Sequence, residues 1–219
     1  FLPVIILILF SSAGAYYSVI GDESLTLIFL PFGWIIMGIV LAYSKIREEF
    51  MRQFAAKNNF TYVGVGDHSS MLGSIFKRGH SQEISNMLVG ERGGNELRFF
   101  FFYYTVGSGK DKSTYSYTVC EIKMKGIAPD IIIESRADWD FQSYAGGHQK
   151  EVLIESAFRE HFAVFAPDDF EIETLEIFTP DVLSELMNRA KKYNLEFIED
   201  RLYMFRFGEI SKKVELEEF

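Results

Sequence analysis

The chain contains 219 residues, of which 48% are hydrophobic and 24% are charged, and its formal net charge at pH 7 is −9. An acidic chain lacks the basic surface that nucleic-acid binding requires, so this class of function is disfavoured. The single cysteine, Cys120, rules out an intrachain disulfide and fits a reducing compartment.

Two apolar segments open the chain, residues 1–20 and 25–43, and neither contains Lys, Arg, Asp or Glu. At about 1.5 Å per residue, each is long enough as a helix to cross the ~30 Å hydrocarbon core of a bilayer. We therefore predict a transmembrane hairpin over residues 1–43 that contacts lipid. A signal peptide cleaved near residues 13–15, which have a small-x-small pattern, is the alternative. The first residue is not Met, so we expect further sequence upstream.

Charges beside the apolar segments predict the orientation. The short connector carries Asp22 and Glu23, whereas Lys45, Arg47 and Arg52 follow the second segment. Because basic residues remain on the cytoplasmic side of a membrane, we expect the large domain to be cytoplasmic. The part of the chain after residue 44 holds 22 basic and 29 acidic side chains, a net charge of −7. This balance disfavours broad adhesion to anionic lipid.

Residues 44–58 predict a juxtamembrane amphipathic helix. Their apolar residues recur at helical spacing and form one stripe, with polar residues opposite. We expect this stripe to pack on the sheet that follows. A helix that transmits a signal from the membrane is the alternative. The stripe consists of Ile46, Phe50, Met51, Phe54 and Ala55.

The next part of the chain alternates short apolar runs with turn residues, which is typical of strands. A helical turn is expected over residues 68–72, and residues 92–95 contain two glycines that suit a hairpin turn. The predicted strands are residues 60–65, 82–91, 96–106 and 114–125.

Residues 99–104 form an unbroken aromatic run of four Phe and two Tyr. Side chains alternate between the faces of a strand, so both faces of this strand are aromatic and both must be covered. We therefore predict that it lies in the interior of its sheet. An aromatic platform for a ligand is the alternative.

Residues 107–113 follow this strand and contain the string Gly-Ser-Gly-Lys. A phosphate-binding loop would need Gly at the position of Tyr104 and Ser or Thr at the position of Asp111. The spacing therefore predicts a solvated hairpin tip instead.

A short strand is expected over residues 131–134, followed by a loop over residues 138–148 that contains Asp138, Asp140 and His148. Two carboxylates beside Trp139 can bind a cation, but no third ligand stands at a fixed spacing. We interpret the loop as a variable insertion and retain its acidic residues as the alternative site of an enzyme.

The last third of the chain predicts a mixture of short elements. Thr179-Pro180-Asp181 begins a helix, with Thr as N-cap and Pro at the first helical position. A final hairpin is expected to turn at Asp200-Arg201, and residues 211–219 form a charged tail. Further expected elements are a strand or turn over 152–156, a helical turn over 158–161, a strand over 162–165, helices over 171–178 and 180–193, and hairpin strands over 195–199 and 202–207.

No motif assigns catalytic chemistry. The four histidines, at positions 68, 80, 148 and 161, have no metal-ligand spacing, and Cys120 lies in an expected strand, where a buried and inert thiol is the default. A Cys-His pair assembled by the fold is the alternative. We assign no catalytic, cofactor-binding or metal-binding residue and expect no cofactor.

The segment 158–207 resembles the C-terminal part of an uncharacterised bacterial family of membrane-anchored proteins with a cytoplasmic domain of unknown function. The resemblance rests on Phe158, Phe162 and Asp168, on Thr179-Pro180 before an amphipathic helix, and on Leu202-Tyr203 in the last strands. Residues 101–117 are similarly like hypothetical bacterial membrane proteins. The resemblance implies a bacterial plasma-membrane location and a fold, but no activity.

We therefore expect an α+β fold. Its parts are a transmembrane hairpin over 1–43, the juxtamembrane helix over 44–58, a cytoplasmic and mostly antiparallel sheet domain with packed helices over 59–210, and the tail over 211–219. The expected function is that of a membrane-tethered, non-enzymatic module that binds a protein partner or self-assembles, including as an accessory subunit of a membrane complex. The alternative is a membrane-bound hydrolase or transferase that uses the acidic residues of 138–148.

Overall fold

The computed structural model describes residues 23–138 and 150–210, with side chains from residue 34 onward. The chain divides into two compact units, Phe1–Gln53 and Phe54–Phe219, which are treated separately. The predicted first apolar helix, most of the loop 138–148 and the charged tail lie outside the described residues.

A single helix, α2 (Glu23–Lys57), links the two units and covers both the second apolar segment and the juxtamembrane segment without a break. Its polar side carries i, i+4 contacts, including an ion pair between Arg52 and Glu48 at 2.7 Å. Within the described residues, no helix meets the length and apolarity needed to cross a membrane.

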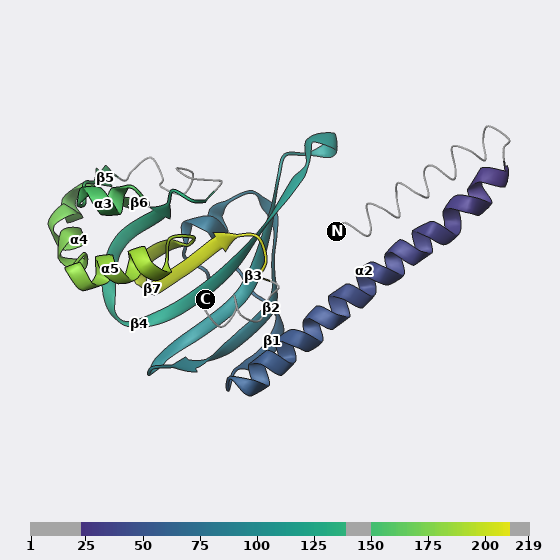
Figure 1. The fold of residues 1–219 in the computed structure, drawn as a ribbon, viewed down its shortest axis with the longest axis horizontal. Coiled ribbons are helices and arrows are strands. Elements are labelled where there is room, and N and C mark those ends of the chain that lie inside the picture. The colour runs from purple at the N-terminus through teal and green to yellow at the C-terminus, as the bar shows by residue number, and fades with distance from the viewer. Residues whose placement is uncertain (1–22, 139–149, 211–219) are drawn as a thin grey trace. The chain divides into compact units, whose positions relative to one another are not determined.

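The second unit is built on a seven-stranded antiparallel sheet whose strand order is β1-β2-β3-β4-β6-β5, with β7 paired to β4 (Figure 1). This arrangement confirms the α+β class and the mostly antiparallel sheet. The strands are β1 (Thr61–Gly66), β2 (His80–Arg92), β3 (Asn95–Val106), β4 (Ser113–Ser135), β5 (Lys150–Val152), β6 (Phe162–Ala166) and β7 (Asn194–Phe207). The helical elements of this unit are η1 (Ser74–Lys77), η2 (Gly109–Asp111), α3 (Ser156–Arg159), η3 (Asp168–Phe170), α4 (Glu171–Ile177) and α5 (Pro180–Arg189).

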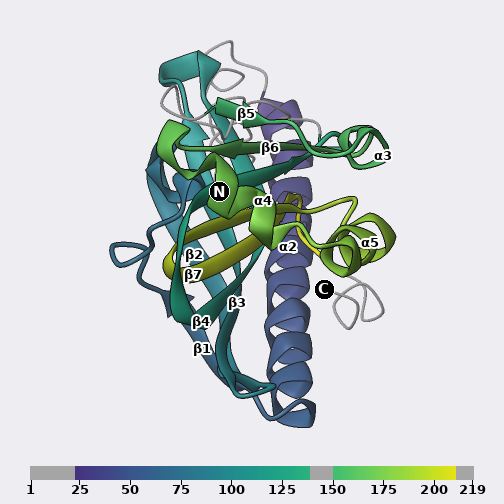
Figure 2. The same cartoon turned by 90° about the vertical axis from the view of Figure 1, so that its left-hand side faces the viewer.

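Strand β4 organises the sheet because it pairs with three other strands. Its first half pairs with β3 on one edge, its second half pairs with β6 on the same edge, and β7 runs along the other edge. The views in Figures 1 and 2 show β1 to β4 side by side and the short helices α3, α4 and α5 gathered at the end that carries β5 and β6.

Two expectations about these long strands are wrong. The segments 114–125 and 131–134 are one strand, β4, and the expected final hairpin at Asp200-Arg201 is one strand, β7. The pairing explains both errors, because β4 advances from Lys123 to Ala128 while β7 moves only from Arg201 to Glu199. Gly126 lies in this bulge, and Pro129 lies in a second register shift between Ala128 and Ile131, so neither turn-forming residue ends the strand.

Hydrophobic clusters lie on opposite faces of the sheet. Ile132 belongs to one cluster, whereas its neighbours Ile131 and Ile133 belong to the other, because successive side chains of a strand point to opposite faces. The first cluster is covered by residues 67–79, which we call the covering loop, and includes Phe76 of that loop. The second is covered by α3, α5 and the residues that follow each of them, including Leu183 of α5.

The aromatic strand β3 lies between β2 and β4, and its two faces are both buried at the centre, as predicted. Phe100, Phe102 and Tyr104 face the first cluster, where the ring of Phe102 lies 4.9 Å from that of Phe76. On the opposite face, Phe101 is fully buried and stacks edge-on against Phe99. The core interpretation of the aromatic run is therefore confirmed.

The start of helix α5 was predicted correctly from the sequence, but its end was not, and the helical turn expected in the covering loop forms only in part. Thr179 caps α5 by accepting a hydrogen bond from the Val182 amide, and Pro180 occupies the first helical position, as predicted. The helix ends at Arg189 rather than near residue 193. The helical turn expected over 68–72 is only a single hydrogen-bonded turn, from the Met71 amide to the His68 carbonyl at 3.1 Å. The helical element of the covering loop is η1, where Phe76 accompanies Ile75 into the core.

Gly79, at the end of the covering loop, has a φ of +57°, and an added Cβ would lie 2.3 Å from the Thr105 carbonyl oxygen. Gly93, in the β2–β3 turn, has a similar φ of +62° but no atom within 4 Å of the same position. We expect Gly79→Ala to lower the free energy of unfolding by about 2 kcal/mol, because it adds a backbone clash to the cost of the left-handed conformation. Gly93→Ala, which carries only the conformational cost, should lower it by about 1 kcal/mol. Urea unfolding of the two variants measures the difference, and equal losses would contradict the contact with Thr105.

Candidate functional site

The segments that sequence reasoning marked as possible sites have structural roles where they are described. Residues 107–113 form the tip of the β3–β4 hairpin, and the Gly107 carbonyl contacts the His80 ring at 2.8 Å. The predicted hairpin tip is therefore confirmed. Asp138 accepts a hydrogen bond from the side chain of Asn194, which in turn accepts one from the Ser135 amide at 2.8 Å. The rest of the acidic loop, through His148, lies outside the described residues.

Cys120 is buried in β4, as predicted. Burial, together with the negative charge of Glu121, raises the pKa of its thiol to about 12. A thiol with such a pKa holds almost no nucleophilic thiolate at neutral pH. Cys120 therefore has the inert role expected from its strand.

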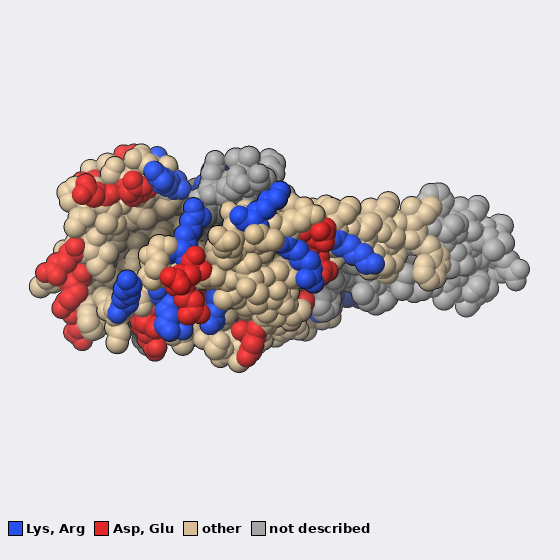
Figure 3. All heavy atoms as spheres, turned by 90° about the horizontal axis from the view of Figure 1, so that it is seen from below, with Lys and Arg blue, Asp and Glu red and all other residues tan. Residues whose placement is uncertain are grey.

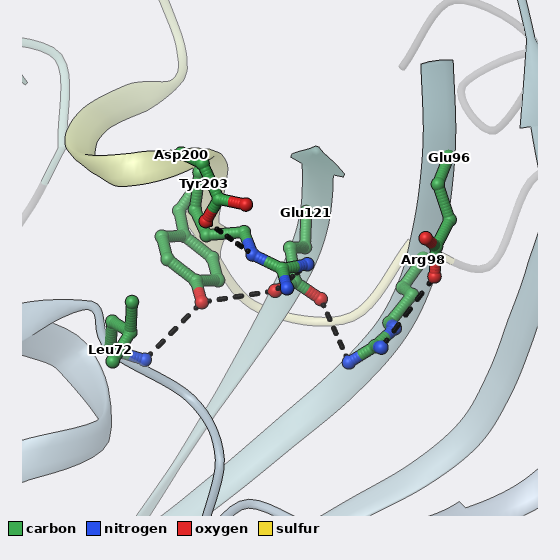
Figure 4. A network of polar contacts seen from close by, with 7 residues as sticks. Leu72, Glu96, Arg98, Glu121, Asp200 and Tyr203 are labelled. Carbon is green, nitrogen blue, oxygen red and sulfur yellow. Dashed lines mark hydrogen bonds and ion pairs between the residues drawn. The ribbon is translucent and has the colours of Figure 1, made fainter. Parts of the chain in front are cut away.

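A polar row crosses the sheet on the face that carries the first cluster, and it was not predicted. Arg98 of β3, Glu121 of β4 and Tyr203 of β7 are direct cross-strand neighbours. Glu121 is only 2% exposed and forms ion pairs with Arg98 at 3.4 Å and with Arg201 at 3.2 Å. Figure 4 shows Arg98 reaching the carboxylate of Glu121 from the neighbouring strand β3. A buried carboxylate is thus balanced by two cations, as burial of charge requires.

Tyr203 connects this row to the covering loop. Its hydroxyl donates a hydrogen bond to Glu121 at 3.1 Å and accepts one from the Leu72 amide at 3.2 Å (Figure 4). Burial and the adjacent Glu121 charge raise the pKa of this hydroxyl, so it stays protonated and remains a donor. The ring of Tyr203 also packs edge-on against Phe76, at 5.3 Å between ring centres.

A second buried carboxylate, Glu196 of β7, holds the same loop. Its oxygens accept hydrogen bonds from the Ser74 amide at 2.8 Å and from the Ser74 hydroxyl at 2.9 Å. Gly73 fits beside it, because an added Cβ would lie 3.1 Å from Glu196 and 3.2 Å from the Tyr203 ring. The pKa of Glu196 is raised to about 7, because burial and the charge of Asp130, which raise it, outweigh the hydrogen bonds from Ser74 and the charge of Lys77, which lower it.

These contacts act as a clamp, which we define as Glu121, Tyr203 and Glu196 together with the amides of Leu72 and Ser74. A carboxyl with a pKa near 7 beside a serine hydroxyl is a pattern also found in catalytic sites. Here, however, the same carboxylate also binds the backbone amide of Ser74, so the hydroxyl is held in a contact that orders the loop. The arrangement positions the covering loop over the core.

The sequence contains a signal for this clamp that our predictions did not use. Every second residue of a strand points to the same face, so Tyr117, Val119 and Glu121 share one face of β4. The first two are buried core residues. A carboxylate in the third position of such a series must be buried and paired. No comparable signal marks Glu196, because its burial depends on the covering loop, which is distant in sequence.

Within the described residues, no group of three or more His, Cys, Asp or Glu side chains is placed to hold a metal ion. The polar groups of the clamp are already used in contacts with one another. Among these contacts in the described part of the chain, no nucleophile, base and oxyanion donor converge on one point.

The comparisons with known proteins bear on the fold. No protein-family model matches the chain, and no curated protein matches its sequence. Among solved structures, the chain is similar to the crystal structure of the mycobacterial trehalose monomycolate transport factor A, TtfA, with a TM-score of 0.60. The likeness covers 78% of this chain and 87% of that one at 7% sequence identity, so it concerns the fold alone.

Proposed function

We propose that this chain is a membrane-tethered module without enzymatic activity that binds a protein partner or self-assembles, as an accessory subunit of a membrane complex. In this proposal residues 1–43 form the transmembrane hairpin, and the sheet domain lies on the cytoplasmic side of a bacterial plasma membrane.

The observation that carries this proposal is the exposed apolar surface of α2 between Trp34 and Ile46. Between Trp34 and Ile46, large apolar side chains are exposed around more than half of the circumference of α2. A helix on the surface of a water-soluble protein instead buries a single apolar stripe and exposes polar residues. Such a helix needs lipid or protein around it. The exposed residues are Trp34, Ile35, Ile39, Leu41, Tyr43 and Ile46.

Two further findings support a non-enzymatic role. The buried carboxylates Glu121 and Glu196 are used in the clamp, which holds the covering loop, and Cys120 is inert. The fold is shared with a protein named as a transport factor, and an accessory role in a membrane transport assembly is compatible with that likeness. The alternative, a hydrolase or transferase using residues 138–148, rests on acidic residues that are mostly outside the described part of the chain.

Membrane topology and association test the proposal. A fluorescent reporter that matures only in the cytoplasm, fused after Phe219, should be fluorescent and should resist carbonate extraction from membranes. Alkaline phosphatase fused at the same point should be inactive; activity would overturn the cytoplasmic orientation. Purification in mild detergent followed by native mass spectrometry should give a complex larger than one chain. Recovery of a monomer alone would overturn the association.

A further inference from the structure

Helix α4 exposes apolar residues where a surface helix normally buries them. Ile172 is 72% exposed and Leu175 is 45% exposed, and their spacing of three places them on one face. Thr174 is fully buried and bonds the Phe170 carbonyl at 2.6 Å, and Ile177 packs on the second hydrophobic cluster. The polar Thr174 thus faces the core while Ile172 and Leu175 face outward. The outward apolar face therefore needs an explanation other than packing within this domain.

The charged residues in the segment around this apolar face of α4 are all acidic. Residues 168–185 contain seven Asp and Glu residues and no Lys or Arg. All seven are exposed, and the one salt bridge that they form within the described structure joins Glu185 to Arg189 at 2.9 Å. Figure 3 shows acidic side chains gathered at the left-hand end, where Figure 1 places α4 and α5. The seven are Asp168, Asp169, Glu171, Glu173, Glu176, Asp181 and Glu185.

We propose that Phe170, Ile172 and Leu175, together with these carboxylates, form a docking surface for a basic amphipathic helix of a partner protein. We call it the α4 surface. The apolar ridge matches the apolar stripe of such a helix, and Glu171 and Glu176, which flank the ridge on α4, match Lys or Arg at the margins of that stripe. The same charges repel an anionic membrane surface, which disfavours lipid as the occupant. This inference rests on the proposed function, because it names the surface and the class of partner for that function.

The test uses the full chain in phosphatidylcholine nanodiscs and a fluorescent 18-residue peptide with Leu at i, i+3, i+4 and i+7 and Lys elsewhere. Empty nanodiscs measure peptide bound by lipid. We expect Ile172→Ser/Leu175→Ser to weaken binding of the peptide at least tenfold, although all the carboxylates remain. Glu171→Lys/Glu176→Lys should also weaken it at least tenfold. A peptide with Glu in place of each Lys should not bind.

A matched control is Ile127→Ser, which removes a more exposed apolar side chain from the β4 bulge and should leave binding unchanged.

Equal binding of the peptide to wild type and to Ile172→Ser/Leu175→Ser would mean attraction by charge alone and would overturn the proposal. Loss of self-association in that double variant would assign the surface to a second copy of the chain and would equally overturn it. If wild type recovers a partner protein in mild detergent and the double variant recovers the same partner equally well, the α4 surface is wrong although the proposed function stands. If wild type itself is a monomer, the proposed function fails.

Discussion

Glu121→Ala is expected to lower the free energy of unfolding of the sheet domain by about 3 kcal/mol. The substitution leaves Arg98 and Arg201 without the carboxylate that pairs with both, and it removes the acceptor of the Tyr203 hydroxyl. Breaking a buried pair typically costs about 3 to 5 kcal/mol, and we take the lower value because the two arginines are 28% and 21% exposed and keep some contact with water. Urea unfolding of the full chain in detergent, followed by circular dichroism, measures the loss.

Glu96 supplies the matched control for this prediction. It pairs with the same Arg98 at 3.6 Å, but it is exposed, so Glu96→Ala should cost less than about 1 kcal/mol. Glu121→Gln separates charge from shape, since its amide oxygen can still accept the Tyr203 hydroxyl, and its loss should fall between the two alanine variants. If Glu121→Ala were as mild as Glu96→Ala, the polar row would have no part in holding the sheet together.

The hydrophobic pattern was enough to predict the centre of the fold. Six consecutive aromatic residues leave no solvent-facing side of a strand, and β3 accordingly has neighbours on both edges and burial on both faces. Thr179-Pro180 predicted the start of α5 because capping chemistry acts within a few residues. Signals of this kind succeed where the physical cause is local.

Prediction failed where pairing overrides local preference. Gly126, Pro129 and Asp200-Arg201 favour turns by themselves, yet they lie in the bulged pairing of β4 with β7, which keeps both strands continuous. The same long-range cause hid the second half of the clamp. Glu196 is buried because a loop more than 100 residues earlier in the chain closes over it, and no local pattern reports such closure.

The two carboxylates of the clamp differ in how their charge is balanced. Glu121 faces two arginines, whereas the charged groups that affect Glu196 are Asp130 of β4, which opposes its ionisation, and Lys77 of η1, which favours it. Hydrogen bonds from Ser74 favour the charged form as well, but burial outweighs them and raises the pKa of Glu196 to about 7. The clamp therefore contains one group that titrates near neutral pH.

Glu196 should make the stability of the sheet domain fall as the pH rises from about 4.5 to about 7. Its pKa is 4.5 in the unfolded chain and about 7 in the folded one, so the folded state binds the proton more tightly. The contribution to stability is present in full below the unfolded pKa and is lost as the pH rises through the folded pKa. The whole loss is on the order of 3 kcal/mol, because one pKa unit corresponds to about 1.4 kcal/mol.

Glu196→Gln isolates this effect from the titration of other carboxylates. The glutamine cannot ionise, and its amide oxygen can still accept a hydrogen bond from Ser74. We expect the wild-type protein to lose roughly 2 to 3 kcal/mol relative to Glu196→Gln between pH 5 and pH 8, measured by urea unfolding at each pH. Ser74→Ala, which removes one hydrogen bond to the carboxylate but keeps the ionisable group, serves as the control and should retain the pH dependence. A constant difference between wild type and Glu196→Gln across this range would show that Glu196 is already ionised in the folded protein at pH 5, and that the covering loop is held by a charged rather than a protonated carboxyl.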